Sequence, residues 1–261
     1  MPIDVVSPTT VESVRPLWAV LVSLVAIPFI VASDRRPNLR EAFTLVAATI
    51  KAVLVLSMLP WVLEGAQAVV QLWEISPGIE LALRVDTLGY VFAVVASVLW
   101  VLTSFYSIGY VRGAGEKKQT RYFASFALCL SATIGICFSA NLLTFVVFFE
   151  ILTLATYPLV IHKETPAALA AARKYLAYTL PAGLTLLFAV AWSVSATGGN
   201  TDFVPGGFLG ATGLSETGLR LLFLLFVLGV GVKAGIMPLH SWLPAAMAAP
   251  TPVSALLHAV A

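Results

Sequence analysis

The sequence predicts an all-α, polytopic membrane helix bundle with seven full transmembrane helices and a truncated eighth. Of its 261 residues, 59% are hydrophobic and only 11% are charged, and the mean hydropathy is +0.95. An ordinary soluble domain carries about 25% charged residues. Apolar runs recur along the chain, and Lys and Arg gather in alternate loops between them. These observations together predict an integral membrane protein.

A helix needs about 20 mostly apolar residues to cross a bilayer core. Seven runs fit this length, and an eighth begins near Pro252. The last ten residues of the chain rise only about 15 Å as a helix, roughly half of a bilayer core. We expect the seven full spans at Leu17–Ala32, Phe43–Leu63, Leu88–Val111, Tyr122–Ala140, Leu142–Ile161, Tyr175–Ala196 and Leu219–Met237.

Basic residues in the loops predict the orientation of the chain. The loops after the first, third and fifth spans hold ten Lys and Arg, whereas the loops on the other side hold only Arg15, Arg84 and Arg220. The positive-inside rule then places the N-terminus outside and the basic loops in the cytoplasm. The N-terminus lacks a signal-peptide pattern, so we expect the first span to be retained. The ten basic residues are Arg35, Arg36, Arg40, Arg112, Lys117, Lys118, Arg121, Lys163, Arg173 and Lys174.

The segments outside the membrane give few functional signals. IELALRVD, at the end of the outer segment Gly65–Asp86, alternates apolar and polar residues as a short strand would. Thr197–Thr217 is rich in Gly and Thr and is expected to be irregular. Arg84 and Asp86 are expected to form an interfacial pair.

Several classes of site are not indicated by the sequence. We find no phosphate loop, Ser-His-Asp constellation, nucleotide fingerprint or paired metal-ligand spacing, so we expect no catalytic site, cofactor or metal in this chain. Cys129 and Cys137 lie about 12 Å apart along one helix and are expected to be unpaired. Basic residues are not interleaved with exposed aromatics, which argues against a nucleic-acid partner.

Glu150 and Lys233 lie deep within two separate apolar runs. A lysine near the middle of a membrane helix costs about 2.5–3.5 kcal/mol on insertion scales, so such residues usually have a function. Glycines surround Lys233, and Pro238 leaves the carbonyl of Ala234 without its helical partner. A carboxylate close to a buried lysine changes how tightly that lysine holds its proton. We therefore expect Glu150 and Lys233 to interact; the alternative for Glu150 is a structural hydrogen bond to a neighbouring helix.

The other intramembrane candidates are three histidines and one lysine. His258 lies in the truncated eighth span and is expected to carry protons onward from Lys233, with a hydrogen-bonded helix contact as the alternative. His240 is either a carrier at the cytoplasmic mouth or a loop anchor, and Arg173 and Lys174 are the alternative place of entry. His162 is expected at the membrane interface. Lys51, in the second span, is expected to extend its amine toward the cytoplasmic face.

These residues occur in an order that resembles a known family. The segment VKAGIMPLHSWLPAAMAAPTPVSALLHA is similar to the hallmark of the antiporter-like membrane subunits shared by respiratory complex I, Mrp-type cation/proton antiporters and membrane-bound hydrogenases. LRVDTLGYVFA, FYSIGYVRG, ANLLTFVVFFEILTLATYPLV and AARKYLAYTL are further similarities. The resemblance implies that Glu150 is the buried glutamate of the fifth helix and Lys233 the central lysine of a broken seventh helix. It also implies that His258 passes protons onward.

The same resemblance predicts how the chain is divided. Residues 1–80 would form the first two transmembrane helices and the outer loop, and residues 81–121 the third helix and its basic loop. Residues 122–261 would form one half-channel of an inverted-repeat transporter, with helices four to eight. The second repeat is absent, so we expect the chain to be a fragment, a split product or part of a longer parent.

The functional expectation follows from these residues and this family. We expect a proton- or monovalent-cation/proton-translocating subunit of a multi-subunit membrane complex, with an Mrp-type antiporter favoured. The alternatives are a proton-pumping subunit of an NADH:quinone oxidoreductase or membrane-bound hydrogenase, and a structural fragment without transport of its own. The expected partners are other membrane subunits, the lipid bilayer and H⁺, either alone or together with Na⁺ or K⁺. The expected location is a bacterial plasma membrane.

Overall fold

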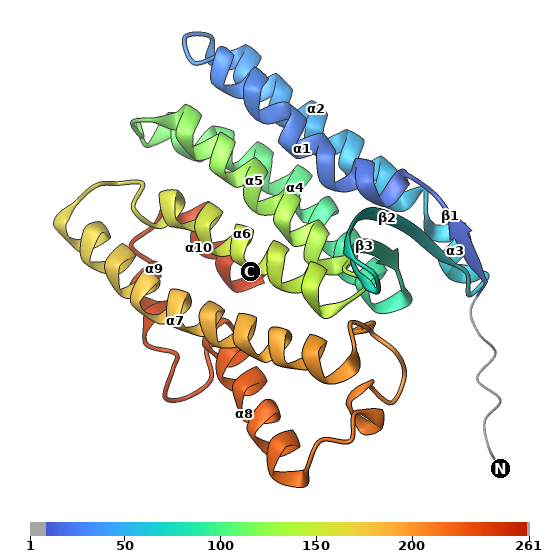
Figure 1. Ribbon diagram of the computed structural model, residues 1–261. Coiled ribbons are helices and arrows are strands. Elements are labelled where there is room, and N and C mark those ends of the chain that lie inside the picture. The colour runs from blue at the N-terminus through green and yellow to red at the C-terminus, as the bar shows by residue number, and fades with distance from the viewer. Residues whose placement is uncertain (1–8, 260–261) are drawn as a thin grey trace.

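The computed structural model describes residues 9–259, which form a row of long helices with a small sheet at one end (Figure 1). The loops that join α1 to α2, α4 to α5 and α6 to α7 lie at the opposite end of the bundle from the sheet. The helices are α1 (Arg15–Ala32), α2 (Pro37–Leu56), α3 (Leu59–Leu63), α4 (Thr87–Gly113), α5 (Gln119–Cys137), α6 (Leu142–Val160), α7 (Pro166–Thr197), the 3₁₀ helix η1 (Leu209–Ala211), α8 (Glu216–Lys233), α9 (Trp242–Ala246) and α10 (Thr251–Ala259).

Within residues 9–259, six helical segments are long and apolar enough to cross a membrane. They are α1, α2 together with α3, α4, α5, α6 and α7. The multi-span membrane protein predicted from the sequence is therefore confirmed. The 18 residues of α8 include three charged side chains, Glu216, Arg220 and Lys233, and this helix is not among the six. A seventh span at α8 and an eighth at α10 stay predictions.

Three predicted boundaries move, each with a local cause. The helix predicted from Tyr175 begins at Pro166, because the hydroxyl of Thr165 caps it and proline suits its first position. The helix predicted to reach Met237 ends at Lys233, two residues before Gly235, whose φ is +65°. The second span begins at Pro37 and is interrupted at Ser57 and Met58, where α2 gives way to α3.

A three-stranded sheet covers one end of the bundle, so the chain is not purely helical. Strand β1 (Thr10–Glu12) pairs in parallel with β2 (Gln67–Ser76), and β2 pairs antiparallel with β3 (Ile79–Val85). Gly78 has a φ of +80° in the turn between β2 and β3, a conformation that glycine adopts without strain. The strand predicted from IELALRVD is confirmed as β3, whereas β1 and β2 were not predicted.

Arg84 and Asp86 do not pair with each other, contrary to the prediction. The Arg84 guanidinium donates to the carbonyls of Ala140 (2.9 Å) and Phe203 (2.6 Å), and it lies 3.7 Å from the Asp202 carboxylate. The Asp86 carboxylate instead accepts a hydrogen bond from the backbone N–H of Gly89 at 2.6 Å. Asp86 is therefore the N-cap of α4, and Arg84 ties β3 to the loop after α7.

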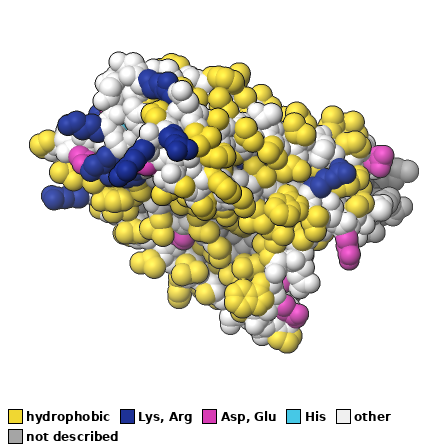
Figure 2. Space-filling model, turned by 90° about the horizontal axis from the view of Figure 1, so that it is seen from above, with side chains coloured by type: hydrophobic (Ala, Val, Ile, Leu, Met, Phe, Trp, Pro, Cys, Tyr) yellow, Lys and Arg dark blue, Asp and Glu magenta, His cyan; other side chains and the backbone are white. Residues whose placement is uncertain are grey.

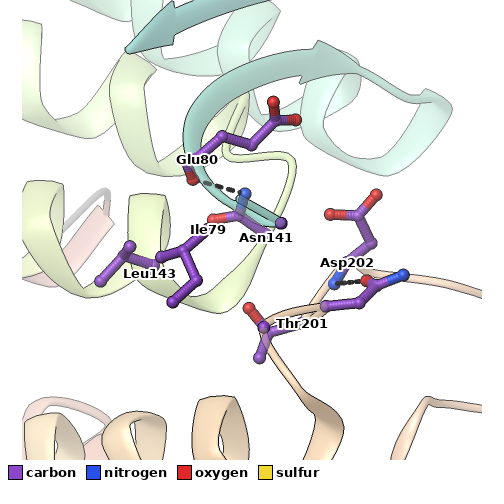
Figure 3. A pocket seen from close by; sticks show the side chains of 9 residues that line it. Ile79, Glu80, Asn141, Leu143, Thr201 and Asp202 are labelled. Carbon is purple, nitrogen blue, oxygen red and sulfur yellow. Dashed lines mark hydrogen bonds between the residues drawn. The ribbon is translucent and has the colours of Figure 1, made fainter. Parts of the chain in front are cut away.

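The same end of the molecule contains a small pocket of about 190 Å³ between β3, the start of α6 and the loop after α7. Figure 3 shows Asn141 in this pocket donating to the carbonyl of Glu80, at 2.9 Å. The carbonyl oxygen of the Asn141 side chain accepts from Thr144 and caps α6. The residues around this pocket therefore connect β3 and the loop after α7 to α6, the helix that carries Glu150.

Charged side chains are gathered at the opposite end of the bundle. Figure 2 shows most of the visible Lys and Arg at one end of that face, and hydrophobic side chains over its middle. We call residues 33–36, 114–118 and 161–165 the basic end. Lys118 and Arg121 both bind Glu164 there, at 2.6 and 2.7 Å, which joins two of these loops. Large apolar side chains point outward from α4, including Phe92, Leu102 and Phe105, each at least 60% exposed.

Candidate functional site

Lys233 is the last residue of α8, and the helix stops where the chain needs a different conformation. Its basic side chain suits the C-terminal end of a helix, where unpaired carbonyls concentrate negative charge. The chain then passes through Gly235 and a turn that contains His240 before α9 begins at Trp242. The predicted break beside Lys233 is therefore present, and it begins one residue after the lysine.

The Lys233 amine contacts α6 directly. Its Nζ donates a hydrogen bond to the backbone carbonyl of Phe149 at 2.9 Å and lies 3.9 Å from the centroid of the Phe149 ring. A cation over an aromatic face is attracted by the negative charge of the ring face. Both contacts involve Phe149, the residue that precedes Glu150 in α6.

The Phe149 carbonyl belongs to a chain of hydrogen bonds between helices. It also accepts from the hydroxyl of Thr153 at 3.0 Å, and the carbonyl of Thr153 accepts from the Tyr175 hydroxyl of α7 at 3.0 Å. The Tyr175 ring packs edge to face against Trp242, with centroids 5.4 Å apart. This chain fixes the α6 backbone against α7 at the height of Lys233.

Trp242 holds the broken end of α8. Its indole N–H donates to the carbonyl of Val232 at 2.7 Å, and its side chain is buried. The carbonyls in the last turn of a helix have no partner within the helix, and this one accepts from both the indole and the backbone N–H of Gly235, the latter at 3.1 Å. Ser241, the preceding residue, donates to the hydroxyl of Tyr178 at 2.8 Å. The segment after the break is thus anchored to both α8 and α7.

Glu150 packs against Gly183 in the middle of α7. A Cβ at position 183 would collide with the Glu150 carboxylate, so glycine is the residue that leaves room for the acid. Within the described part of the chain, the buried Oε1 of Glu150 has no hydrogen-bond partner, and no ion pair joins the carboxylate to Lys233. The structure therefore places the two residues near each other without joining them, and it does not supply the structural hydrogen bond considered as the alternative.

The structure shows less of the surroundings of the two histidines predicted as carriers than of Lys233 and Glu150. His240 lies in the turn after α8, as predicted, and among the described residues its buried Nδ1 has no partner. His258 belongs to α10 by its backbone, but its side chain lies outside the described residues. His162 is buried rather than exposed at an interface, with a side chain that is 0% exposed. Burial lowers the pKa of the His162 imidazole.

A groove of about 320 Å³ runs between α7 and α8 beside the break. Its lining includes Val232, which precedes Lys233, and the hydroxyl-bearing residues Tyr178 and Thr185. Hydroxyl groups of this kind can hold water close to a buried amine. The arrangement can therefore bind, hold and release a proton at Lys233, with an unpaired carboxylate close enough to influence it.

Sequence reasoning missed Gly183, Tyr175 and Trp242. The position of Gly183 two residues after Pro181, in the middle of a long helix, is a signal of close packing that could have been followed. Tyr175 and Trp242 gave no comparable signal, because a buried aromatic residue in a membrane helix is ordinary and its partner depends on the fold.

Comparison with known proteins finds relatives that point to one family. Residues 139–261 match the family model described as NADH:quinone oxidoreductase/Mrp antiporter, TM. The chain is 32% identical over 182 residues to hydrogenase-4 component B of Escherichia coli, covering 69% of this chain and 26% of the relative. It is 29% identical over 250 residues to a protein of Staphylococcus aureus described as antiporter subunit mnhA2, covering 93% of this chain and 30% of the relative.

Solved structures share the fold. A chain of the Mrp complex from Dietzia sp. DQ12-45-1b superposes with a TM-score of 0.74 at 22% identity, covering 93% of this chain and 45% of that chain. A chain of the membrane-bound sulfane sulfur reductase, an archaeal respiratory membrane complex, gives a TM-score of 0.82 at 21% identity, covering 94% and 50%. The chain spans less than a third of the curated relatives' length. Through residues 139–261, it belongs to the NADH:quinone oxidoreductase/Mrp antiporter family of membrane subunits.

Proposed function

We propose that this chain is a proton- or monovalent-cation/proton-translocating subunit of a multi-subunit membrane complex, of the Mrp antiporter type. The observation that carries this proposal is the contact of Lys233, at the broken end of α8, with the α6 carbonyl that precedes the unpaired acid Glu150. An intramembrane amine and carboxylate at a helix break form a typical pathway for ions. The names of the similar antiporter subunits and of the Mrp complex support the same choice.

The proposed proton path uses the residues around the break. Protons reach Lys233 from the end that carries His240, along the groove between α7 and α8, and continue to His258 in α10. Movement of the Glu150 carboxylate toward or away from Lys233 changes how tightly the amine holds its proton. Because Oε1 of Glu150 has no hydrogen-bond partner among the described residues, no such bond at Oε1 has to break when the carboxylate moves.

The proposal includes the finer arrangement expected from the sequence. Residues 122–261 form a half-channel, with α8 as a seventh span and α10 as the start of an eighth, after an N-terminal unit at 1–80 and a third helix with its basic loop at 81–121. The N-terminus lies outside, and the membrane is a bacterial plasma membrane. The transported ions are H⁺ and, in an antiporter, Na⁺ or K⁺. The alternation of basic loops supports this orientation.

A second candidate is a proton-pumping subunit of a redox-driven complex. The 32% identity with hydrogenase-4 component B and the fold shared with a membrane-bound reductase favour it. Purification of the complex that contains this chain separates the two candidates. Co-purified flavin or iron–sulfur subunits would support the redox complex, whereas small hydrophobic partners without redox centres would support the antiporter.

The direct test of transport is replacement of Lys233 in the assembled complex. Lys233→Ala removes the proton-carrying amine, so we expect vesicles that contain the variant complex to lose ΔpH formation driven by Na⁺, K⁺ or redox substrate. Lys117→Ala, which removes an exposed lysine of the loop between α4 and α5, is the matched control and should keep full activity. Undiminished transport in a normally assembled Lys233→Ala complex would reject the proposal and leave this chain a purely structural part.

A further inference from the structure

Lys51 is a second intramembrane lysine, and it lies far along the chain from the family segment at 139–261. The sequence predicts that its amine reaches toward the cytoplasmic face, but the structure contradicts this. Lys51 is 0% exposed in α2. Its Nζ donates to the Ser23 hydroxyl of α1 at 2.6 Å and lies 5.0 Å from the centroid of the Trp100 ring of α4. The amine therefore points into the bundle rather than along its surface.

The surroundings of Lys51 contain donors and few acceptors. Within the described residues, no carboxylate forms an ion pair with this amine. The indole N–H of Trp100 and the hydroxyl of Ser104 are also buried without a partner among these residues. A buried charge without a counter-charge is costly, and the same amine without its third proton gains an acceptor lone pair. The site is therefore suited to an amine that gains and loses a proton.

A file of polar side chains leads from Lys51 toward the basic end. Trp100, Ser104 and Ser107 are spaced four and three residues apart, so they share one face of α4 and lie about 6 and 4.5 Å apart along its axis. All three are buried. The Ser107 hydroxyl is hydrogen-bonded to the Tyr122 hydroxyl of α5 at 3.0 Å.

The file continues from Tyr122 to the edge of the basic end. The Tyr122 ring meets the imidazole of His162 edge to face, with centroids 5.5 Å apart. His162 Nε2 lies 3.8 Å from the Glu116 carboxylate, which is partly exposed in the loop between α4 and α5. Neither imidazole nitrogen of His162 has a hydrogen-bond partner within residues 9–259. Polar groups thus recur from the protein surface to the amine, in helices that the Glu150–Lys233 site does not use.

The charged and titratable groups around this file are limited in number. The Cys137 thiol of α5 is the titratable group that interacts electrostatically with Lys51, while α1 presents Ser23 and α4 presents Trp100. Around His162 the groups are Glu116, Arg121, Lys163 and Glu164, two of each sign. The outer part of the file therefore has no strong charge imbalance that would exclude a proton.

We propose that Lys51 is a second proton-binding site of this chain, filled from the basic end through Glu116, His162, Tyr122, Ser107 and Ser104. The site is separate from Glu150 and Lys233, and its existence does not depend on the transport assigned to those residues. A proton binds the Nζ lone pair and leaves along the same file, so no other reactant is needed.

The test is the ¹⁵N resonance of the Lys51 Nζ in the full-length chain, labelled with ¹⁵N-lysine and reconstituted in lipid. Lys51→Met identifies the signal by removing it. We expect its chemical shift to move when the pH of the reconstituted sample is changed, as the amine passes between its two protonation states. Tyr122→Phe removes the hydroxyl that bonds Ser107 and should slow proton exchange about tenfold, the effect expected for loss of one hydrogen bond from the route. Tyr106→Phe is the control and should not change exchange, because Tyr106 is an exposed tyrosine of α4 whose hydroxyl makes no hydrogen bond within residues 9–259.

Two results would overturn the proposal. A Lys51 signal that stays at one shift throughout the titration would show an amine fixed in one protonation state, which binds and releases no proton. A signal that titrates, but whose exchange Tyr122→Phe leaves at the wild-type rate, would reject the route. The measurement requires no transport, so failure here leaves the function proposed for Lys233 untouched, and loss of transport in Lys233→Ala does not affect this result.

Discussion

Glu150 and Lys233 are held to different degrees by their surroundings. The Lys233 amine has both a carbonyl and a ring face of Phe149 as partners, whereas the buried Oε1 of Glu150 has no partner in the described structure. Carboxylate oxygens accept up to about four hydrogen bonds between them, so Glu150 has unused capacity. At the scale of single residues, the acid is the part of this pair that is freer to move.

Gly183 gives a way to move that acid without removing its charge. Gly183→Ala places a Cβ against the Glu150 carboxylate, which is the flexible end of a side chain and can turn aside. We expect transport by the complex to fall by about tenfold or more, because the acid is misplaced relative to Lys233, while thermal stability changes little. Gly109→Ala is the control, since a Cβ there meets nothing within 4 Å. Normal transport in Gly183→Ala would argue against a positional role for Glu150.

The burial of His162 should make the stability of the protein depend on pH. Burial lowers the pKa of its imidazole below the unfolded value of about 6.5, so the unfolded chain binds more protons in the interval between the two values. Stability is thus fully present above about pH 6.5 and falls as the pH drops toward the folded pKa. We expect thermal unfolding in detergent to show a smaller loss between pH 7 and 5 for His162→Gln than for the wild type. Equal losses would contradict a neutral, buried His162.

At the scale of elements, the position of α8 depends on its contact with α7. A Cβ at Gly229 would come within 2.8–3.0 Å of the Cβ, Cα and N of Leu186, so the two helices meet almost backbone to backbone. Small residues permit this approach in membrane proteins. The contact sets the height at which Lys233 faces α6, and it links helix packing to the candidate site.

Gly229→Ala should therefore disturb the whole of α8. Since the atoms in the way include backbone, the helices have to separate, and we expect a loss of about 1–3 kcal/mol in unfolding free energy. Gly218→Ala in the same helix is the control, because its nearest neighbours lie at 3.4 Å or more. Thermal or denaturant unfolding of both variants provides the measurement. Equal stability of the two would show that α7 and α8 are not closely packed.

The elements also show what the sequence could predict. Long apolar runs predicted α1, α4, α5 and α6 well, because a bilayer imposes both length and composition on a span. The strand β3 was visible in an alternating pattern, but the three-residue β1 forms by pairing with β2, where Thr10 lies opposite Gln67. The partner of Arg84 is likewise distant, in a loop 118 residues further along the chain. The burial of Lys51 could not be predicted, because it depends on how α1, α2 and α4 meet.

The candidate site, too, could be predicted from the sequence only in part. Glu150 and Lys233 were identifiable, since a charge in an apolar run is conspicuous in any sequence. Their contact through Phe149, the room left by Gly183 and the anchor supplied by Trp242 arise from tertiary packing. Roles of His240 and His258 stay predictions. Among the described residues no hydrogen bond joins His240 to Lys233, and the His258 side chain lies outside them.

At the scale of the whole molecule, two groups of helices carry separate polar features. Helices α6, α7 and α8 hold Glu150 and Lys233, and all three lie within the segment that matches the family. Helices α1, α2 and α4 hold Lys51, with α5 packed against both groups. Figure 1 shows these helices side by side, with the sheet at one end and the basic loops at the other. We propose that Glu150 and Lys233 act together to move a proton through the first of these groups.

A double-mutant cycle of transport shows whether the two residues act as a unit. Initial rates of ΔpH formation are compared in vesicles with the wild-type complex and with Glu150→Gln, Lys233→Gln and both substitutions together, at equal assembly. If the pair acts as a unit, each single substitution lowers the rate below that of the wild type. The small rate that remains in the double variant is then no lower than that of Lys233→Gln alone. Rate losses that multiply in the double variant, or full activity of Glu150→Gln, would contradict the account.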